Sequence, residues 1–167
     1  MDSIDAKLIT ILQQNARLSL KEIAEMVFLS PPAVSARIEK LEQQGIITGY
    51  TAQVDPLKLG YHITAFINLE MTPKEKQVFY PFIRKCPNVL ECSCITGQYC
   101  MLIKVAFDST MELDTFVGEL QKFGSTSTQI VFSTVVPPRG VVVNESAARE
   151  DEKNSELFAG KHTEKKL

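Results

Sequence analysis

The sequence has few of the residues from which catalytic sites are commonly built. It contains two histidines, His62 and His162, and no base–nucleophile pair or metal-ligand spacing accompanies either of them. No apolar run approaches the roughly 18 residues of a membrane span, and no basic-then-apolar leader opens the chain. We therefore expect a cytoplasmic protein that is not an enzyme, needs no metal or cofactor and does not enter a membrane.

Cysteine is also sparse, and its spacing is not that of a strong zinc site. Cys92 and Cys94 share one face of a predicted strand, so a metal or redox role is conceivable. Thiols in the cytosol more often pack as small apolar side chains, and this C-x-C pair has no histidine near it. We favour packing for all four cysteines, Cys86, Cys92, Cys94 and Cys100.

Two short amphipathic helical patterns lie on either side of a break within residues 19–50. Ser19 and Glu22 have the spacing of a capping box and predict the start of one helix. Ser30, followed by Pro31 and Pro32, predicts the start of the next helix. With a further helix over residues 2–15, the pattern is typical of a helix-turn-helix, although any small helical hairpin gives similar stripes.

The outer face of the second helix of this pair holds the candidate DNA contacts. Arg37 is expected either to contact a DNA phosphate or simply to lie on a solvated face of the helix. The same two alternatives apply to Lys40. Sequence readout falls more naturally to residues near the helix start. The candidate set is Ser30, Pro31, Pro32, Ser35, Ala36, Arg37 and Lys40.

Positive charge is scarce in this segment. Residues 1–50 carry five Lys and Arg against six Asp and Glu, and the net charge of the chain is −2. Each neutralised phosphate adds a salt-dependent increment to affinity, so one copy should bind DNA weakly. We expect several copies to act together on one DNA.

Beyond residue 50 the pattern changes to alternating strands and helices. Residues 48–54 predict a strand, residues 55–56 a turn and residues 57–60 a hinge. The order that follows is βαββαβ, which is the ferredoxin-like split βαβ arrangement. The predicted elements are a strand over 63–71, a helix over 73–85, strands over 89–96 and 99–107, a helix over 110–123 and a strand over 129–136. Thr72 with Glu75, and Ser109 with Glu112, predict capping boxes at the two helix starts.

These predictions give an α+β chain, with a winged helix-turn-helix domain followed by a ferredoxin-like domain. The predicted domains are 1–50, a linker over 51–60, and 61–143. Residues 144–167 are polar and charged, with Leu157 and Phe158 as the large apolar residues, so we expect a mobile tail of unknown role.

Several motifs, in order along residues 2–140, resemble the Lrp/AsnC (feast/famine) family of transcriptional regulators. They are Leu29-Ser30-Pro31, Val34, Arg37, Leu41-Glu42, Gly45-Ile46-Ile47, Gly49-Tyr50, Val54-Asp55-Pro56, Leu59-Gly60-Tyr61 and Thr96-Gly97-Gln98-Tyr99. The resemblance implies double-stranded DNA as a partner and a second domain that senses a small effector, most commonly an amino acid. It also implies sheets that pair into homodimers, and dimers that assemble into octamers.

The resemblance places an effector pocket at the hairpin 95–100, together with the loop predicted over 124–128. Its candidate residues are Thr96, Gly97, Gln98, Tyr99, Cys100, Ser125 and Thr126. Cys100 stands where many relatives carry an aspartate, so the acceptor for an ammonium group is less obvious. Loss of that carboxylate indicates an altered choice of effector, or none. Gly97 is alternatively a simple hairpin glycine. The rival function is an architectural DNA-binding regulator that responds to no effector.

Phe28 departs from the pattern of the helix-turn-helix. The residue that opens the turn is commonly glycine, because the backbone there tends to need a positive φ, and a bulky residue in that conformation costs roughly 1 kcal/mol or more. Two explanations follow from the sequence. Either the turn is built differently, or Phe28 gains burial against the first helix.

Overall fold

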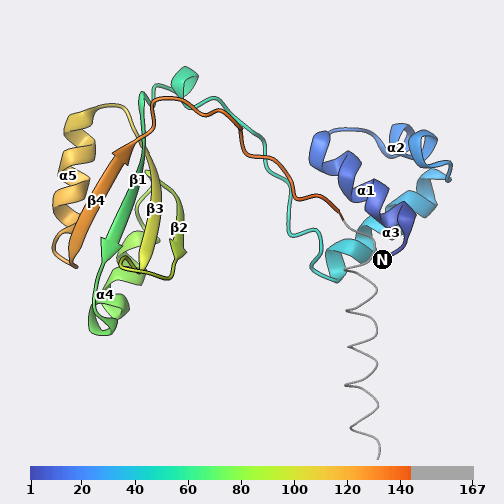
Figure 1. The fold of residues 1–167 in the computed structure, drawn as a ribbon. Coiled ribbons are helices and arrows are strands. Elements are labelled where there is room, and N and C mark those ends of the chain that lie inside the picture. The colour runs from blue at the N-terminus through green and yellow to red at the C-terminus, as the bar shows by residue number, and fades with distance from the viewer. Residues whose placement is uncertain (144–167) are drawn as a thin grey trace, which may run out of the picture. The chain divides into compact units, whose positions relative to one another are not determined.

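The computed structural model describes residues 1–143, and the predicted tail over 144–167 lies outside them. The described chain forms two compact units (Figure 1). The first contains residues 1–52 together with 137–143, and the second contains residues 53–136. Within residues 1–143, no helix has both the length and the apolar character needed to cross a membrane.

The first unit is built from three helices, α1 (Ser3–Gln14), α2 (Leu20–Val27) and α3 (Pro31–Gln43). Their apolar stripes meet in one small core, as the helical spacing predicted. The buried members of that core are Leu8, Ile23, Ala24, Val27 and Val34. The three-helix arrangement with a short turn between α2 and α3 is confirmed.

Each helix of this unit begins at a side-chain cap. The Ser19–Glu22 capping box is confirmed, because the Ser19 N–H donates to Glu22 Oε2 at 2.7 Å and the Ser19 hydroxyl accepts from the Glu22 N–H at 3.3 Å. The sequence prediction missed a second box, formed by Asp2 and Asp5 at the start of α1. Capping satisfies backbone N–H groups that have no partner within the helix.

The strand predicted over 48–54 is wrong. These residues form no regular secondary structure and join no sheet, so the helical unit has no wing within residues 1–143. A strand needs a paired neighbour to satisfy its backbone groups, and apolar character alone does not supply one. The predicted hinge over 57–60 contains a short 3₁₀ helix, Leu57–Leu59.

The second unit has the predicted βαββαβ order. Its elements are β1 (Ile63–Glu70), α4 (Pro73–Ile83), β2 (Val89–Cys94), β3 (Met101–Phe107), α5 (Thr110–Leu120) and β4 (Ser125–Ile130). The four strands form one antiparallel sheet in the order β2-β3-β1-β4, which confirms the ferredoxin-like prediction. The C-terminal end of β1 and the first residues of β3 and β4 meet at one end of the sheet (Figure 1).

Side chains from one face of the sheet and from both helices form the core of this unit. Strand β1 alternates, with Ala65, Ile67 and Leu69 fully buried. They pack with Phe79 of α4 and Phe116 of α5 in one cluster. Because alternate strand residues point to opposite faces, the intervening side chains of β1 lie on the other face of the sheet.

The last strand is displaced from its prediction. It begins at Ser125, four residues before Gln129, and ends at Ile130. Its register is set by β1, which pairs Glu70 with Ser125 and Ala65 with Ile130. The Ser- and Thr-rich segment predicted as a loop therefore forms an edge strand, where half-exposed hydroxyl side chains are tolerated.

Strands β2 and β3 are also shorter than predicted, because the connection between them is a longer loop. Strand β2 ends at Cys94, and β3 starts at Met101. The Ile95 N–H donates to the Cys100 carbonyl at 3.0 Å and closes that loop. The Ser109–Glu112 box is half formed: the Ser109 hydroxyl accepts from the Glu112 N–H at 3.3 Å, but within residues 1–143 the Glu112 carboxylate makes no return bond to the Ser109 N–H. The neighbouring Asp108 carboxyl raises the pKa of Glu112.

Candidate DNA-binding surface and effector site

The N-terminal end of α3 presents small and rigid side chains to solvent. The Ser30 hydroxyl accepts from the Ala33 N–H at 3.4 Å, so it serves as the helix cap. Pro31, Pro32 and Ala36 are exposed along the first turns. This end of the helix offers close backbone approach and apolar contact.

Ser35 is paired with a carboxylate on the same helix. Its hydroxyl donates to Glu39 Oε1 at 2.9 Å, one helical turn further along. The helical pattern predicted Glu39 on the outer face that holds the candidate DNA contacts, although the final candidate set did not include it. The i, i+4 spacing from Ser35 was the available signal, because residues four apart on a helix lie side by side.

Arg37 is held by the first helix. Its Nη1 lies 2.7 Å from Asp2 Oδ2 and 2.6 Å from Asp5 Oδ1. The Asp5 N–H and, less strongly, the guanidinium lower the pKa of Asp2, and the two carboxylates raise the pKa of Arg37. Asp5 is buried, so this ion pair ties α3 to α1.

Lys40 differs from Arg37 in having no such partner. It is exposed on α3, and within residues 1–143 no ion pair or hydrogen bond involves its ammonium group. An unpaired ammonium loses no existing contact when it neutralises a phosphate. Of the two cations predicted on this face, Arg37 is therefore held in ion pairs with α1, whereas Lys40 is available to a phosphate.

Phe28 adopts the left-handed conformation that the turn requires. Its φ and ψ are 57° and 44°, and its side chain is 91% exposed. Both explanations drawn from the sequence are wrong, because the turn has its usual backbone and the ring gains no burial. The strain of a non-glycine residue at positive φ is left uncompensated by packing.

The predicted hairpin of the effector site is an exposed loop over residues 95–100. Thr96, Gly97 and Gln98 are exposed, and Gly97 has a φ of 113°, a conformation that favours glycine. Tyr99 and Cys100 are half-buried. The loop thus presents a hydroxyl, an amide and backbone groups to solvent.

Cys100 turns inward from this loop. Its backbone N–H donates to the Leu69 carbonyl at 3.1 Å, and its Sγ lies 3.5 Å from the Leu69 carbonyl oxygen and 3.7 Å from that of Met71. The side chain also contacts the core. Cys100 therefore fastens the loop to the end of β1.

Ser125 and Thr126 lie on the other side of the same strand end. They pair with Glu70 and Leu69 of β1, and the Gln121 Nε2 donates to the Thr126 Oγ1 at 3.4 Å. Gly124 packs directly on the Glu70 carbonyl, where a Cβ would overlap the oxygen. The two predicted effector segments therefore flank the last residues of β1.

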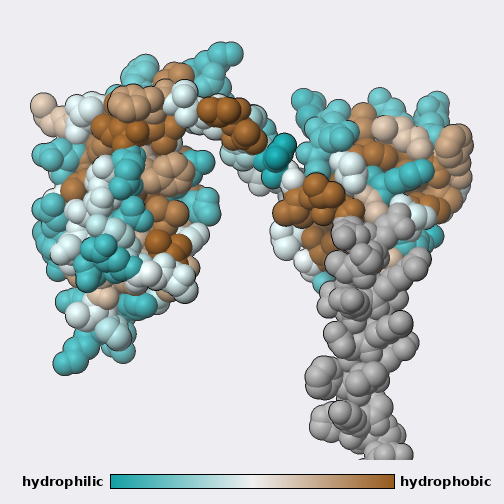
Figure 2. All heavy atoms as spheres, in the orientation of Figure 1, coloured by the Kyte–Doolittle hydropathy of each residue, from teal (hydrophilic) through white to brown (hydrophobic). Residues whose placement is uncertain are grey.

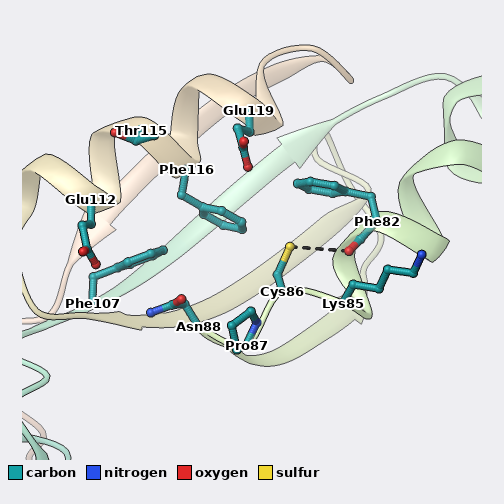
Figure 3. A pocket seen from close by; sticks show the side chains of 10 residues that line it. All are labelled: Phe82, Lys85, Cys86, Pro87, Asn88, Phe107, Glu112, Thr115, Phe116 and Glu119. Atoms are coloured by element: carbon teal, nitrogen blue, oxygen red, sulfur yellow. Dashed lines mark hydrogen bonds between the residues drawn. The ribbon is translucent and has the colours of Figure 1, made fainter.

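A separate cavity of about 560 Å³ lies between α5 and the end of α4 (Figure 3). Three aromatic rings, from Phe82, Phe107 and Phe116, project toward it, and Glu112 and Glu119 stand on its α5 side. None of the seven predicted effector residues, all in the described part of the chain, line this cavity. Its residues carried no sequence motif that could have marked them.

All four cysteines are free thiols. Cys86, Cys92 and Cys100 pack against the core of the sheet unit, whereas Cys94 is exposed. Burial raises the pKa of the Cys86 and Cys92 thiols. A raised pKa disfavours the thiolate, which is the form that binds metals and attacks disulfides.

Comparison with known proteins agrees with both units. Residues 1–42 match the AsnC-type helix-turn-helix domain, and residues 64–141 match the Lrp/AsnC ligand binding domain. The chain belongs to the Lrp/AsnC family. Among its relatives, the transcriptional regulator YezC of Bacillus subtilis is 37% identical over 134 residues, covering 80% of this chain and 95% of YezC.

Solved structures of the Lrp/AsnC family have the same fold. The structure of Bacillus subtilis LrpC has a TM-score of 0.78 and 30% identity, covering 83% of this chain and 99% of that one. The Neisseria meningitidis regulator NMB0573, solved in complex with L-Met, has a TM-score of 0.80 and 26% identity, covering 84% of this chain and 96% of that one. This Lrp/AsnC protein is thus a transcriptional regulator with a helix-turn-helix domain and a ligand-binding domain, and its relatives are regulators, not enzymes.

Proposed function

We propose that this Lrp/AsnC regulator reads DNA with the exposed N-terminal half of α3. Pro32, Ser35 and Ala36 lie on the exposed or half-exposed side of that half, where a recognition helix contacts base edges. Glu39 joins them through its hydrogen bond with Ser35, and a carboxylate can accept from the amino group of cytosine.

In this proposal Lys40 contacts the DNA phosphates, and Arg37 stabilises the packing of α3 against α1. The ion pairs of Arg37 with Asp2 and Asp5 support its structural role. A single helical unit then brings few free cations to the DNA backbone, so affinity depends on several copies bound side by side. We propose homodimers that assemble further into octamers, as tetramers of dimers, acting in the cytoplasm.

The ligand, in this proposal, is an amino acid bound where the predicted hairpin and the start of β4 meet the end of β1. The convergence of these two segments on the last residues of β1 is the observation that carries the proposal. The amino-acid complex of the structural neighbour from Neisseria meningitidis supports this class of ligand. Binding there biases the assembly state, and so the spacing of the α3 helices on DNA.

A thermal-shift panel of the standard amino acids on the full chain tests the response. A ligand that binds only the folded state raises stability by about 2.7 kcal/mol at a hundredfold excess over Kd. We expect one or a few amino acids to raise Tm and to change the sedimentation of the protein. If no amino acid shifts Tm, the rival reading, a DNA-binding regulator without an amino-acid effector, replaces this proposal.

A further inference from the structure

An amino-acid ligand needs two kinds of partner, donors for its carboxylate and acceptors for its ammonium group. The predicted effector residues supply donors through the side chains of Thr96, Gln98 and Ser125. Cys100 supplies no acceptor, because its thiol faces the carbonyl oxygens of Leu69 and Met71. None of the predicted residues carries a carboxylate.

The residue that both segments flank is Glu70, the last residue of β1. On one side it pairs with Ser125 in the β1–β4 ladder. On the other side Leu69 pairs with Met101, so the loop over 95–100 leaves the ladder directly beside Glu70. Each neighbouring strand lies one inter-strand spacing away, about 5 Å. Ser125, which pairs with Glu70, projects its side chain to the same face of the sheet as Glu70, whereas Thr126, which pairs with the buried Leu69, projects toward the helices. Glu70 is therefore central between the loop and Ser125.

The carboxylate of Glu70 is available for a ligand. The residue is exposed, and in the described part of the chain no hydrogen bond or ion pair involves its carboxylate. Nearby Glu75, in contrast, accepts from the Thr72 N–H at 2.6 Å and is used to start α4. Leu69 is fully buried toward the helices, so Glu70 points to the opposite face of the sheet.

Gly124 fixes the position of the donors beside this carboxylate. Because its backbone packs on the Glu70 carbonyl, β4 starts at a set distance from the end of β1. Ser125 follows at once in the ladder, opposite Glu70. The site thus has rigid walls on its β4 side and an exposed glycine-containing loop on the other.

We infer that Glu70 is the acceptor for the ammonium group of the effector, with the ligand carboxylate held by hydroxyl and amide donors of the flanking segments. This inference rests on the proposed amino-acid response and names the residue that selects an amino acid over other carboxylic acids. A carboxylate with no cation of its own favours an ammonium group over a hydroxyl, because a charge-assisted hydrogen bond is stronger than a neutral one.

The test is a titration of full-length Glu70→Gln with the amino acid that raises Tm most in the panel, and with its 2-hydroxy analogue. We expect Glu70→Gln to weaken binding of the amino acid by about ten- to a hundredfold. Its effect on the 2-hydroxy analogue should be much smaller, because that ligand carries no ammonium group. A purely structural role for Glu70 would weaken both ligands equally and would overturn the inference.

Two matched variants serve as controls. Glu91→Gln removes an exposed carboxylate from β2 of the same sheet, and Glu119→Gln removes one from the wall of the separate cavity. Both should leave the Kd unchanged. If Glu119→Gln weakens binding while Glu70→Gln does not, the ligand occupies the cavity and the inference is wrong, although the amino-acid response stands. If no amino acid binds the unmodified protein, the inference and the proposed response both fail.

Discussion

Phe28 shows how a single residue can be set by backbone geometry at a cost in stability. It holds a left-handed conformation with its ring 91% exposed, so no buried contact offsets the strain. A glycine adopts the same φ without a steric penalty. The turn between α2 and α3 thus forms although its left-handed position holds a phenylalanine in place of a glycine.

We expect Phe28→Gly to stabilise the helical unit by about 1 kcal/mol, because it removes the strain of a side chain at positive φ. Chemical denaturation followed by circular dichroism measures this change. Phe28→Ala is the matched control, since it removes the ring and keeps the Cβ, and it should gain little. An equal gain in both variants would assign the effect to the exposed ring and not to the backbone.

Arg37 and Lys40 separate structural from DNA-contacting roles on one helix. Arg37→Ala should destabilise the helical unit by about 1–2 kcal/mol, because it leaves the buried Asp5 without its cation. Its salt slope of DNA binding should match that of the unmodified protein. Lys40→Ala should change the free energy of unfolding by no more than about 0.5 kcal/mol. It should reduce the slope of log K against log salt concentration for DNA binding by about one.

Denaturation curves and DNA titrations over a range of salt concentrations measure both effects. Asp5→Asn is the control for Arg37, since it weakens the same pair and leaves the cation in place. If Arg37→Ala reduced the salt slope of DNA binding and left stability unchanged, Arg37 would be a phosphate contact and not a structural residue.

The Asp2 carboxyl gives the helical unit a dependence on acid. Its pKa is lowered by the Asp5 N–H and then by Arg37. A carboxyl with a depressed folded-state pKa contributes stability above its unfolded pKa, and that contribution is lost as pH falls through the folded value. Below about pH 4, Tm should therefore fall more steeply in the unmodified protein than in Asp2→Asn. Parallel Tm curves for the two proteins would contradict this.

At the scale of elements, the start of β4 depends on a close approach between backbones. Gly124 lies on the carbonyl of Glu70, and a Cβ there would overlap the oxygen. Either β4 must shift against β1, or the chain must bend before the strand. Both changes disturb the ladder that pairs Ser125 with Glu70.

Gly124→Ala should destabilise the sheet unit by at least about 2 kcal/mol, since rigid backbone cannot yield as a side chain does. Gly118→Ala is the control, because a Cβ at that position of α5 meets no atom within 4 Å. It should stabilise α5 by roughly 0.5–1 kcal/mol. Denaturation of both full-length variants tests the pair, and a neutral Gly124→Ala would mean that β4 shifts freely.

The helices were predictable to within a few residues because their signals are local. Ser19, Ser30 and Ser109 mark helix starts through side chains that cap nearby N–H groups. Strand ends depend on pairing partners far along the chain, and so β4 was misplaced although its domain and order were correct. The same limit hid the pairing of Arg37 with Asp2, because 35 residues separate them.

The candidate effector site was predictable in part for the same reason. A glycine-containing hairpin is a local signal, and the loop around Gly97 forms where it was predicted. Glu70 gave no local signal, because it ends an ordinary strand. Its position between the two effector segments exists only once β1 is paired on both sides.

At the scale of the whole molecule, the described chain exposes more apolar side chain than a single copy can cover. Hydrophobic side chains reach the surface of both units (Figure 2). In the second unit, the segment after β4 is the clearest case, with Phe132 99% and Val135 92% exposed. Isolated exposed apolar residues are common, whereas a run of them marks an interaction surface.

We expect the exposed apolar side chains after β4 to be buried when copies of the chain associate, and so to stabilise the assembly. Phe132→Ser should raise the dissociation constant of the assembly about ten- to a hundredfold, since burying a phenylalanine contributes about 1.5–3 kcal/mol. Sedimentation over a range of concentrations measures it. Met111→Ser is the control, because Met111 is 79% exposed on α5, away from the run in sequence. Equal effects of the two substitutions would mean that general surface hydrophobicity drives assembly, and no effect of Phe132→Ser would place the interface elsewhere on the molecule.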